Sequence, residues 1–107
     1  MTKGVGTLSY MSPEMLNEED YDYKTDVYSF GVVLYAIFTG NLLKQNLKDK
    51  INGKKIDLPS SSSSNSISKI CIDLVRNCMQ PKPADRPSFD QILSYIRKND
   101  YKLADYV

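Results

Sequence analysis

The longest apolar stretch of the chain runs from residue 25 to residue 39 and leaves almost no polar face. Thr25 or Asp26 is suited to cap its start, and Gly40 is suited to end it. The stretch is rich in β-branched and aromatic residues, but its length and its start and stop signals favour a helix over a strand. A helix that is apolar all round has to be covered on every side. We therefore expect a central buried helix, part of whose covering lies outside these 107 residues.

The other periodic segments predict amphipathic helices. Residues 67–79 place apolar side chains at helical spacing, and Pro81 and Pro83 stop the helix. Ser88 and Gln91 form a capping-box pattern that opens a last helix. Shorter helices are expected after Ser12, a good N-cap followed by proline, and over residues 42–53, where apolar residues recur at a spacing of four.

The remaining segments are expected to be loops, namely residues 1–11, 17–24 and 54–66. The serine run 60–64 is interpreted as a solvated spacer in preference to a phosphorylation site. The sequence thus predicts an all-α helical subdomain over residues 1–98, followed by a polar-aromatic tail over residues 99–107.

The net charge indicates which classes of partner are expected, and the cysteines indicate the cellular compartment. The net charge of +1 shows no excess of positive charge that would indicate binding to nucleic acid or to an anionic membrane surface. The longest uninterrupted apolar run, residues 31–38, is too short to span a bilayer, and the first residues lack the apolar core of a signal peptide. Cys71 and Cys78 lie about 10 Å apart along a helix, too far for a disulfide. Reduced cysteines are typical of an intracellular protein, so a cytoplasmic location is expected.

Two features concern metal and nucleotide sites. The chain has no histidine, so the commonest general base and metal ligand is missing, and we expect no metal site. Gly4-Val5-Gly6 begins like a phosphate-binding loop, but the third glycine is absent and no strand precedes it. A glycine-containing turn is the better interpretation.

Three segments together carry a more specific signal. Residues 6–14, GTLSYMSPE, resemble the G-T-x-x-Y-x-x-P-E segment of protein kinases, which ends in the A-P-E motif. Residues 26–32, DVYSFGV, resemble the D-x-W-S-x-G segment of the same family, and residues 78–89, CMQPKPADRPSF, resemble its C-W-x-x-x-P-x-x-R-P-S-F segment. The order and spacing agree over about residues 3–97. Tyr28 and Met79 replace the usual tryptophans, but both are large and apolar.

The resemblance implies the C-terminal helical subdomain, or C-lobe, of the eukaryotic-type protein kinase fold, and it is closest to the tyrosine-kinase-like branch of serine/threonine kinases. Glu14 and Arg86 match an ion pair that ties the end of the activation segment to the last helices. We expect a buried pair in preference to a solvated one. Asp26 matches a residue that bonds the backbone of the catalytic loop, and Val33 and Ile37 match positions that anchor a hydrophobic column running up to the adenine.

The resemblance also implies a role in substrate docking. Gly6, Thr7 and Tyr10 lie in the segment that matches the loop holding the substrate residue after the phosphoacceptor. Thr7 matches the threonine that touches the catalytic aspartate and lysine in serine/threonine kinases, which is a supporting role. The parent enzyme is therefore expected to phosphorylate serine or threonine.

The catalytic motifs of the family are absent from these 107 residues. We find no D-F-G and no V-A-I-K, and H-R-D is impossible without histidine. We therefore expect no catalytic residue, cofactor or metal in this chain, and we expect ATP and Mg²⁺ to bind elsewhere in the intact parent. Its partners would be the N-terminal part of the kinase domain and the parent's protein substrate. The alternatives are a kinase-derived interaction module without catalysis and a non-functional remnant of a kinase.

Overall fold

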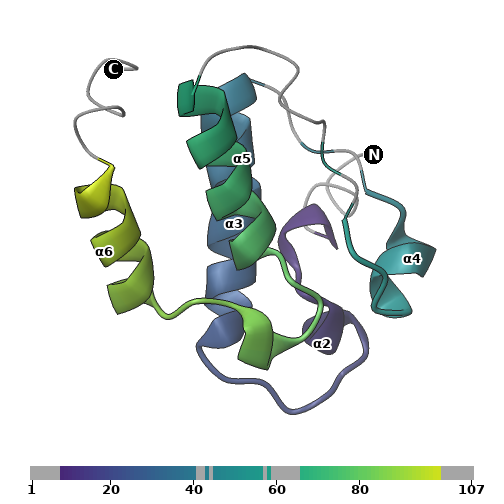
Figure 1. Cartoon of the computed structure of the whole chain (residues 1–107). Coiled ribbons are helices and arrows are strands. Elements are labelled where there is room, and N and C mark those ends of the chain that lie inside the picture. The colour runs from purple at the N-terminus through teal and green to yellow at the C-terminus, as the bar shows by residue number, and fades with distance from the viewer. Residues whose placement is uncertain (1–7, 41–42, 44, 57, 59–65, 100–107) are drawn as a thin grey trace.

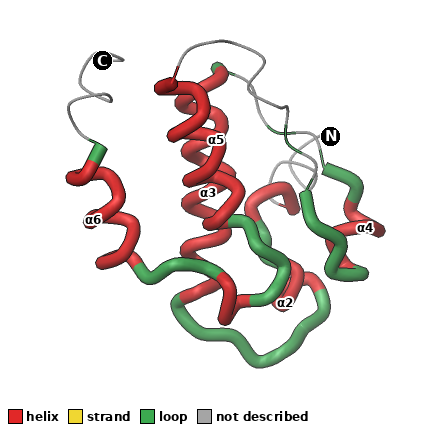
Figure 2. The backbone as a smooth tube through the Cα atoms, in the orientation of Figure 1, coloured by secondary structure: helices red, strands yellow, loops and turns green. Residues whose placement is uncertain are grey.

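The computed structural model describes residues 8–40, 43, 45–56, 58 and 66–99. Within these ranges the chain forms helices and loops, and no described residue belongs to a strand, which confirms the all-α prediction (Figure 2). The elements are α2 (Pro13–Leu16), α3 (Lys24–Thr39), α4 (Leu47–Ile51), α5 (Ser66–Cys78), the 3₁₀ turn η1 (Pro83–Asp85) and α6 (Phe89–Lys98).

The core lies between α3 and α5, which run side by side (Figure 1). Val27 and Val32 of α3 are fully buried, as are Val75 and Cys78 of α5. The two helices approach closely at Gly31, where an added Cβ would lie 2.8 Å from the Cβ of Cys78. The apolar sequence of α3 is thus used first to pack against α5.

The described residues cover only part of α3, in agreement with the expectation that these 107 residues do not supply its whole covering. Val33 is 39% exposed and Ile37 is 65% exposed, although both lie in the most apolar part of the helix. The buried residues of α3 are instead Thr25, Val27, Tyr28, Gly31, Val32 and Leu34. One side of α3 therefore carries apolar surface that no described residue covers.

The ends of α2, α3 and α6 follow local capping signals, with one correction at the start of α3. Ser12 and Ser88 cap α2 and α6 with their side chains, and the predicted capping box with Gln91 is present. Gly40 ends α3 in the left-handed conformation, at φ 77°, as predicted. However, α3 begins one to two residues earlier than predicted, after Tyr23, whose side chain makes no cap. The Oδ1 atom of Asp22 instead accepts a hydrogen bond from the backbone N–H of Lys24 at 2.9 Å.

The helix predicted over residues 42–53 is much shorter in the structure, where α4 covers only Leu47–Ile51. Asn46 caps it by accepting a hydrogen bond from the N–H of Asp49 at 3.1 Å, which fixes a start in the middle of the predicted helix. In addition, residues 8–10 are helical, within a segment predicted to be a loop. The serine run 60–64 and residues 100–107 of the tail lie outside the described residues.

Both cysteines are free and buried, as predicted. Burial raises the pKa of the Cys78 thiol to about 12, so the group stays neutral at physiological pH.

In the described part of the chain, no helix is both long enough and apolar enough to cross a membrane.

Candidate functional site

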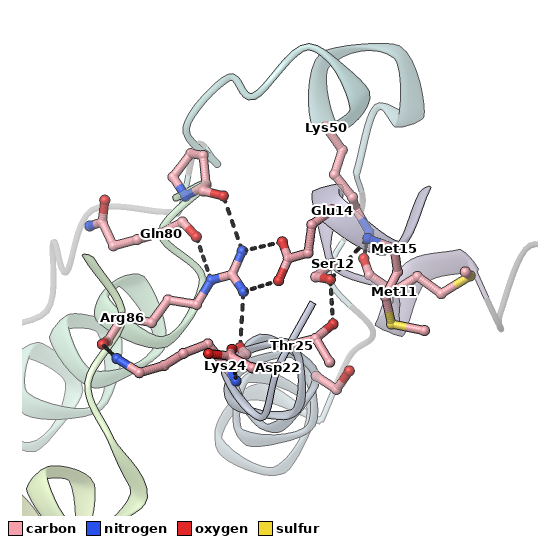
Figure 3. Close-up of polar contacts among 12 residues, drawn as sticks. Met11, Ser12, Glu14, Met15, Asp22, Lys24, Thr25, Lys50, Gln80 and Arg86 are labelled. Atoms are coloured by element: carbon pink, nitrogen blue, oxygen red, sulfur yellow. Dashed lines mark hydrogen bonds and ion pairs between the residues drawn. The ribbon is translucent and has the colours of Figure 1, made fainter. Parts of the chain in front are cut away.

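The strongest polar feature of the structure joins α2 to the loop after η1. The guanidinium of Arg86 meets the carboxylate of Glu14 in a two-pronged ion pair, with N–O distances of 2.6 and 2.8 Å (Figure 3). Both side chains are buried. Two parallel charge-assisted bonds of this kind are among the strongest that proteins form.

Arg86 also uses its remaining donors. Its Nε donates to the carbonyl of Gln80 at 2.7 Å, and its two terminal nitrogens donate to the carbonyls of Lys24 at 2.9 Å and Pro81 at 3.0 Å. A guanidinium has five N–H groups, so all five are paired. The same group lies over the ring of Tyr28, 5.0 Å from its centroid. Complete pairing offsets the high cost of burying this charge.

The pair affects the titration of Glu14. Burial alone would raise the pKa of its carboxyl, but the hydrogen bond and charge of Arg86, with help from Ser12, bring the pKa below the ordinary value of 4.5. A carboxyl whose pKa is lower in the folded state contributes stability above its unfolded pKa and loses this contribution as the pH falls through the folded value.

The melting temperature should therefore drop on acidification below about pH 4.5 more steeply in the wild-type protein than in Glu14→Gln. The variant starts from a lower melting temperature at pH 7, and the gap between the two proteins should shrink toward pH 3. Thermal unfolding at several pH values measures this gap. A gap that stays constant would show that the pair does not shift the pKa of Glu14.

A second group of contacts fixes residues 8–11, the stretch directly before the cap of α2. The Nζ atom of Lys50, on α4, donates to the carbonyls of Leu8, Ser9 and Met11 at 3.0, 3.2 and 2.9 Å. Gln45 adds a bond from its Nε2 to the carbonyl of Ser9 at 2.8 Å. This stretch, named here the 8–11 segment, is thus attached to α4 and to the residues before it.

Helix α3 completes the attachment. The hydroxyl of Ser29 donates to the carbonyl of Tyr10 at 2.6 Å. The hydroxyl of Tyr28 donates to the Oε1 of Gln45 at 3.3 Å, and the hydroxyls of Ser12 and Thr25 are hydrogen-bonded to each other. The 8–11 segment therefore rests on α3 from one side and on α4 from another.

The residues predicted for the site have different positions. Gly6 and Thr7 lie outside the described residues. Tyr10 is in the 8–11 segment with its side chain 37% exposed, while Asp26 is exposed in the first turn of α3. The structure joins Glu14 and Arg86 directly in an ion pair, and Val33 and Ile37 lie one turn apart on α3 with exposed side chains.

Sequence reasoning missed Lys50, Gln45 and Ser29. Lys50 precedes the last apolar position of the 42–53 pattern, where a lysine is normally exposed. Its partners are backbone carbonyls, which leave no trace in residue types. No signal in the sequence pattern would have identified these contacts.

The donor atoms of the described residues do not suit a metal ion. Nowhere in these ranges do three or more acidic, cysteine or histidine side chains come together. The site instead consists of a buried ion pair and of one ammonium, one amide and one hydroxyl group that donate to the carbonyls of the 8–11 segment.

Known proteins have sequences similar to that of this chain. The family model for the protein kinase domain matches residues 1–96. The chain is 36% identical over 109 residues to the RGS domain-containing serine/threonine-protein kinase A of Dictyostelium discoideum, covering 94% of this chain and 9% of that protein. It is 35% identical over 96 residues to mitogen-activated protein kinase kinase kinase 12 of Rattus norvegicus, covering 85% of this chain and 10% of that protein.

A third relative is the serine/threonine/tyrosine-protein kinase HT1 of Arabidopsis thaliana, which is 31% identical over 103 residues, covering 90% of this chain and 25% of that protein. The chain thus spans between about a tenth and a quarter of the length of these relatives. They confirm the resemblance to serine/threonine kinases of the tyrosine-kinase-like branch. Because the family model matches nearly the whole sequence, the chain belongs to the protein kinase family.

Proposed function

We propose that the chain forms part of the C-lobe of a serine/threonine protein kinase and that its 8–11 segment helps to hold the protein substrate. The intact enzyme would transfer a phosphate group from ATP to serine or threonine. The observation that carries the proposal is the fixed backbone of the 8–11 segment, where side chains from α3 and α4 bond the carbonyls of all four residues. The side chain of Tyr10 remains partly exposed on this fixed backbone.

A rigid docking segment suits phosphoryl transfer. In this reaction the protein contributes mainly by positioning the reactants and stabilising charge. A segment that is already ordered loses little conformational entropy when a peptide binds to it. The Glu14–Arg86 pair supports the same region, because Glu14 lies in the helix that directly follows the segment.

The 107 residues alone are proposed to be inactive. They contain no histidine and none of the glycine-rich, lysine, H-R-D or D-F-G motifs through which the family binds ATP and Mg²⁺. The described residues offer no donor set for Mg²⁺ either, so the groups that bind ATP and metal are assigned to other parts of an intact kinase. A cytoplasmic location is proposed as well, because both cysteines are free thiols.

A chimeric kinase tests the catalytic part of the proposal. In it, residues 8–96 of this chain replace the matched segment of mitogen-activated protein kinase kinase kinase 12. We expect the chimera to transfer labelled phosphate from ATP to serine and threonine peptides and not to tyrosine peptides, and we expect the 107-residue chain alone to transfer none. A folded but inactive chimera, or an active isolated chain, would contradict the proposal.

The size of the protein that the source cells produce tests whether the chain is part of a whole kinase in the cell. An antibody against residues 99–107 should detect a band well above the 12.2 kDa of this chain in lysate of the source cells. A band near 12.2 kDa would instead favour a non-catalytic interaction module, for which the exposed Val33 and Ile37 on α3 offer a binding surface.

A further inference from the structure

The environment of Lys50 is unusual for a lysine. The residue is only 5% exposed, and its three hydrogen bonds go to the carbonyls of the 8–11 segment. An ammonium group has three donors, so each of its hydrogens has an acceptor. No carboxylate of the described residues forms an ion pair with this ammonium, so its charge is stabilised by backbone dipoles and by the ring of Tyr28, whose centroid lies 5.3 Å from Nζ.

Burial removes the charged ammonium group of Lys50 from water, which costs free energy that its contacts have to offset. This burial lowers the pKa of Lys50 from 10.5 to about 8. A methionine would fill similar space without a charge, but it would leave the carbonyl of Met11 without its partner from α4. What Lys50 adds over an apolar residue is therefore the fixed arrangement of these carbonyls.

The position of α4 makes this arrangement a link between distant parts of the chain. Lys50 lies 39 to 42 residues beyond its three partners. The same end of α4 has a second attachment, because the side-chain amide of Asn17, directly after α2, donates to the carbonyl of Ile51, the neighbour of Lys50, at 2.9 Å. The helix is thus fixed both to the 8–11 segment and to the helix that follows it.

We propose that Lys50 is a positioning residue for substrate binding: its ammonium group fixes the backbone of the 8–11 segment in the conformation that accepts the peptide. The inference rests on the proposed docking role of this segment. It adds a specific residue of α4 to that role, and this residue acts on the substrate only through the backbone that it fixes.

The matched control is Lys54. Lys50 and Lys54 line the same cavity of about 230 Å³, but the side chain of Lys54 is 71% exposed and lies 3.9 Å from the carboxylate of Asp49. Among the described residues, the hydrogen bonds to the 8–11 segment come from Lys50, Gln45 and Ser29 and not from Lys54. Replacing either lysine by methionine removes one positive charge from the lining of this cavity. Only Lys50→Met removes bonds to the segment.

Hydrogen–deuterium exchange of the full chain tests the structural half of the inference. Peptides that cover residues 8–11 should exchange at least tenfold faster in Lys50→Met than in the wild type, while Lys54→Met leaves them unchanged. Lys50→Gln, which retains two donor hydrogens, should fall between. If Lys50→Met does not fold, as judged by far-UV circular dichroism, the exchange rates of residues 8–11 are compared between Lys50→Gln and Lys54→Met instead. Equal exchange in folded variants would overturn the inference.

Kinetics of the chimera test the functional half. Lys50→Met should raise the KM for the peptide about tenfold and change kcat and the KM for ATP less than twofold, and Lys54→Met should change none of them. A lower kcat with an unchanged peptide KM would mean that Lys50 only supports the fold, and would overturn the positioning role. A chimera that is inactive even with Lys50 intact would refute the proposed kinase function, while the exchange experiment would still decide whether Lys50 fixes the segment.

Discussion

Replacing Arg86 with alanine is expected to lower the free energy of unfolding by about 3–5 kcal/mol, the range found when one partner of a buried ion pair is removed. The loss leaves the carboxylate of Glu14 buried without its cation, and it also leaves the carbonyls of Lys24, Gln80 and Pro81 without their donor. Denaturant unfolding of the chimera, with and without the substitution, measures the difference.

The chain contains its own control for this experiment. Arg76 pairs with Asp73 at 3.0 Å, but both side chains are exposed, so Arg76→Ala should cost less than about 1 kcal/mol. If Arg76→Ala and Arg86→Ala had the same effect, burial would not be what makes the Glu14–Arg86 pair important. An unchanged stability in Arg86→Ala would remove the pair from the description of the site.

Gly31→Ala should have the next largest effect, a loss of about 1–3 kcal/mol from overpacking. The new methyl group would lie 2.8 Å from both the Cβ of Cys78 and the Cγ of Met79. Alanine favours a helix over glycine by up to about 1 kcal/mol, but the clash outweighs this gain because a Cβ cannot rotate away from its own backbone. Chemical denaturation of the single variant measures the loss.

Two further variants identify its cause. Adding Met79→Ala to Gly31→Ala relieves only the contact at Met79, so the double variant should lose less than the sum of the two single substitutions. Ala36→Gly, on the same helix, gives the size of the propensity effect together with the loss of one half-buried methyl group, and should cost about 1 kcal/mol or slightly more. A Gly31→Ala variant more stable than the wild type would mean that α3 and α5 can separate at little cost.

Local signals account for most of what the sequence predicted correctly. Ser12, Ser88 and Gly40 act on helix ends within three or four residues of themselves, so their roles follow from the neighbouring sequence. The start of α4 was misplaced because Asn46 was read as one more polar position in an amphipathic pattern, whereas its side chain caps the helix. The sequence predicted that these residues would cover α3 incompletely, but not which side would stay exposed, because composition reveals how apolar a helix is and not which of its sides the rest of the chain covers.

The contacts of the site depend on residues far apart in sequence. Glu14 and Arg86 are separated by 72 positions, and only the resemblance to a family brought them together in advance. Lys50 was missed because its partners are carbonyl groups, and every residue has one. A pattern of side chains carries no information about which of these groups a distant lysine will reach.

The same property leaves the 8–11 segment open to evolutionary change. Because Lys50 and Ser29 hold main-chain oxygens, a substitution of the exposed Tyr10 alters the surface chemistry of the segment without removing the acceptors that hold its backbone. Under the proposed docking role, such a substitution would change the peptide that the segment prefers while Lys50 keeps its loop geometry.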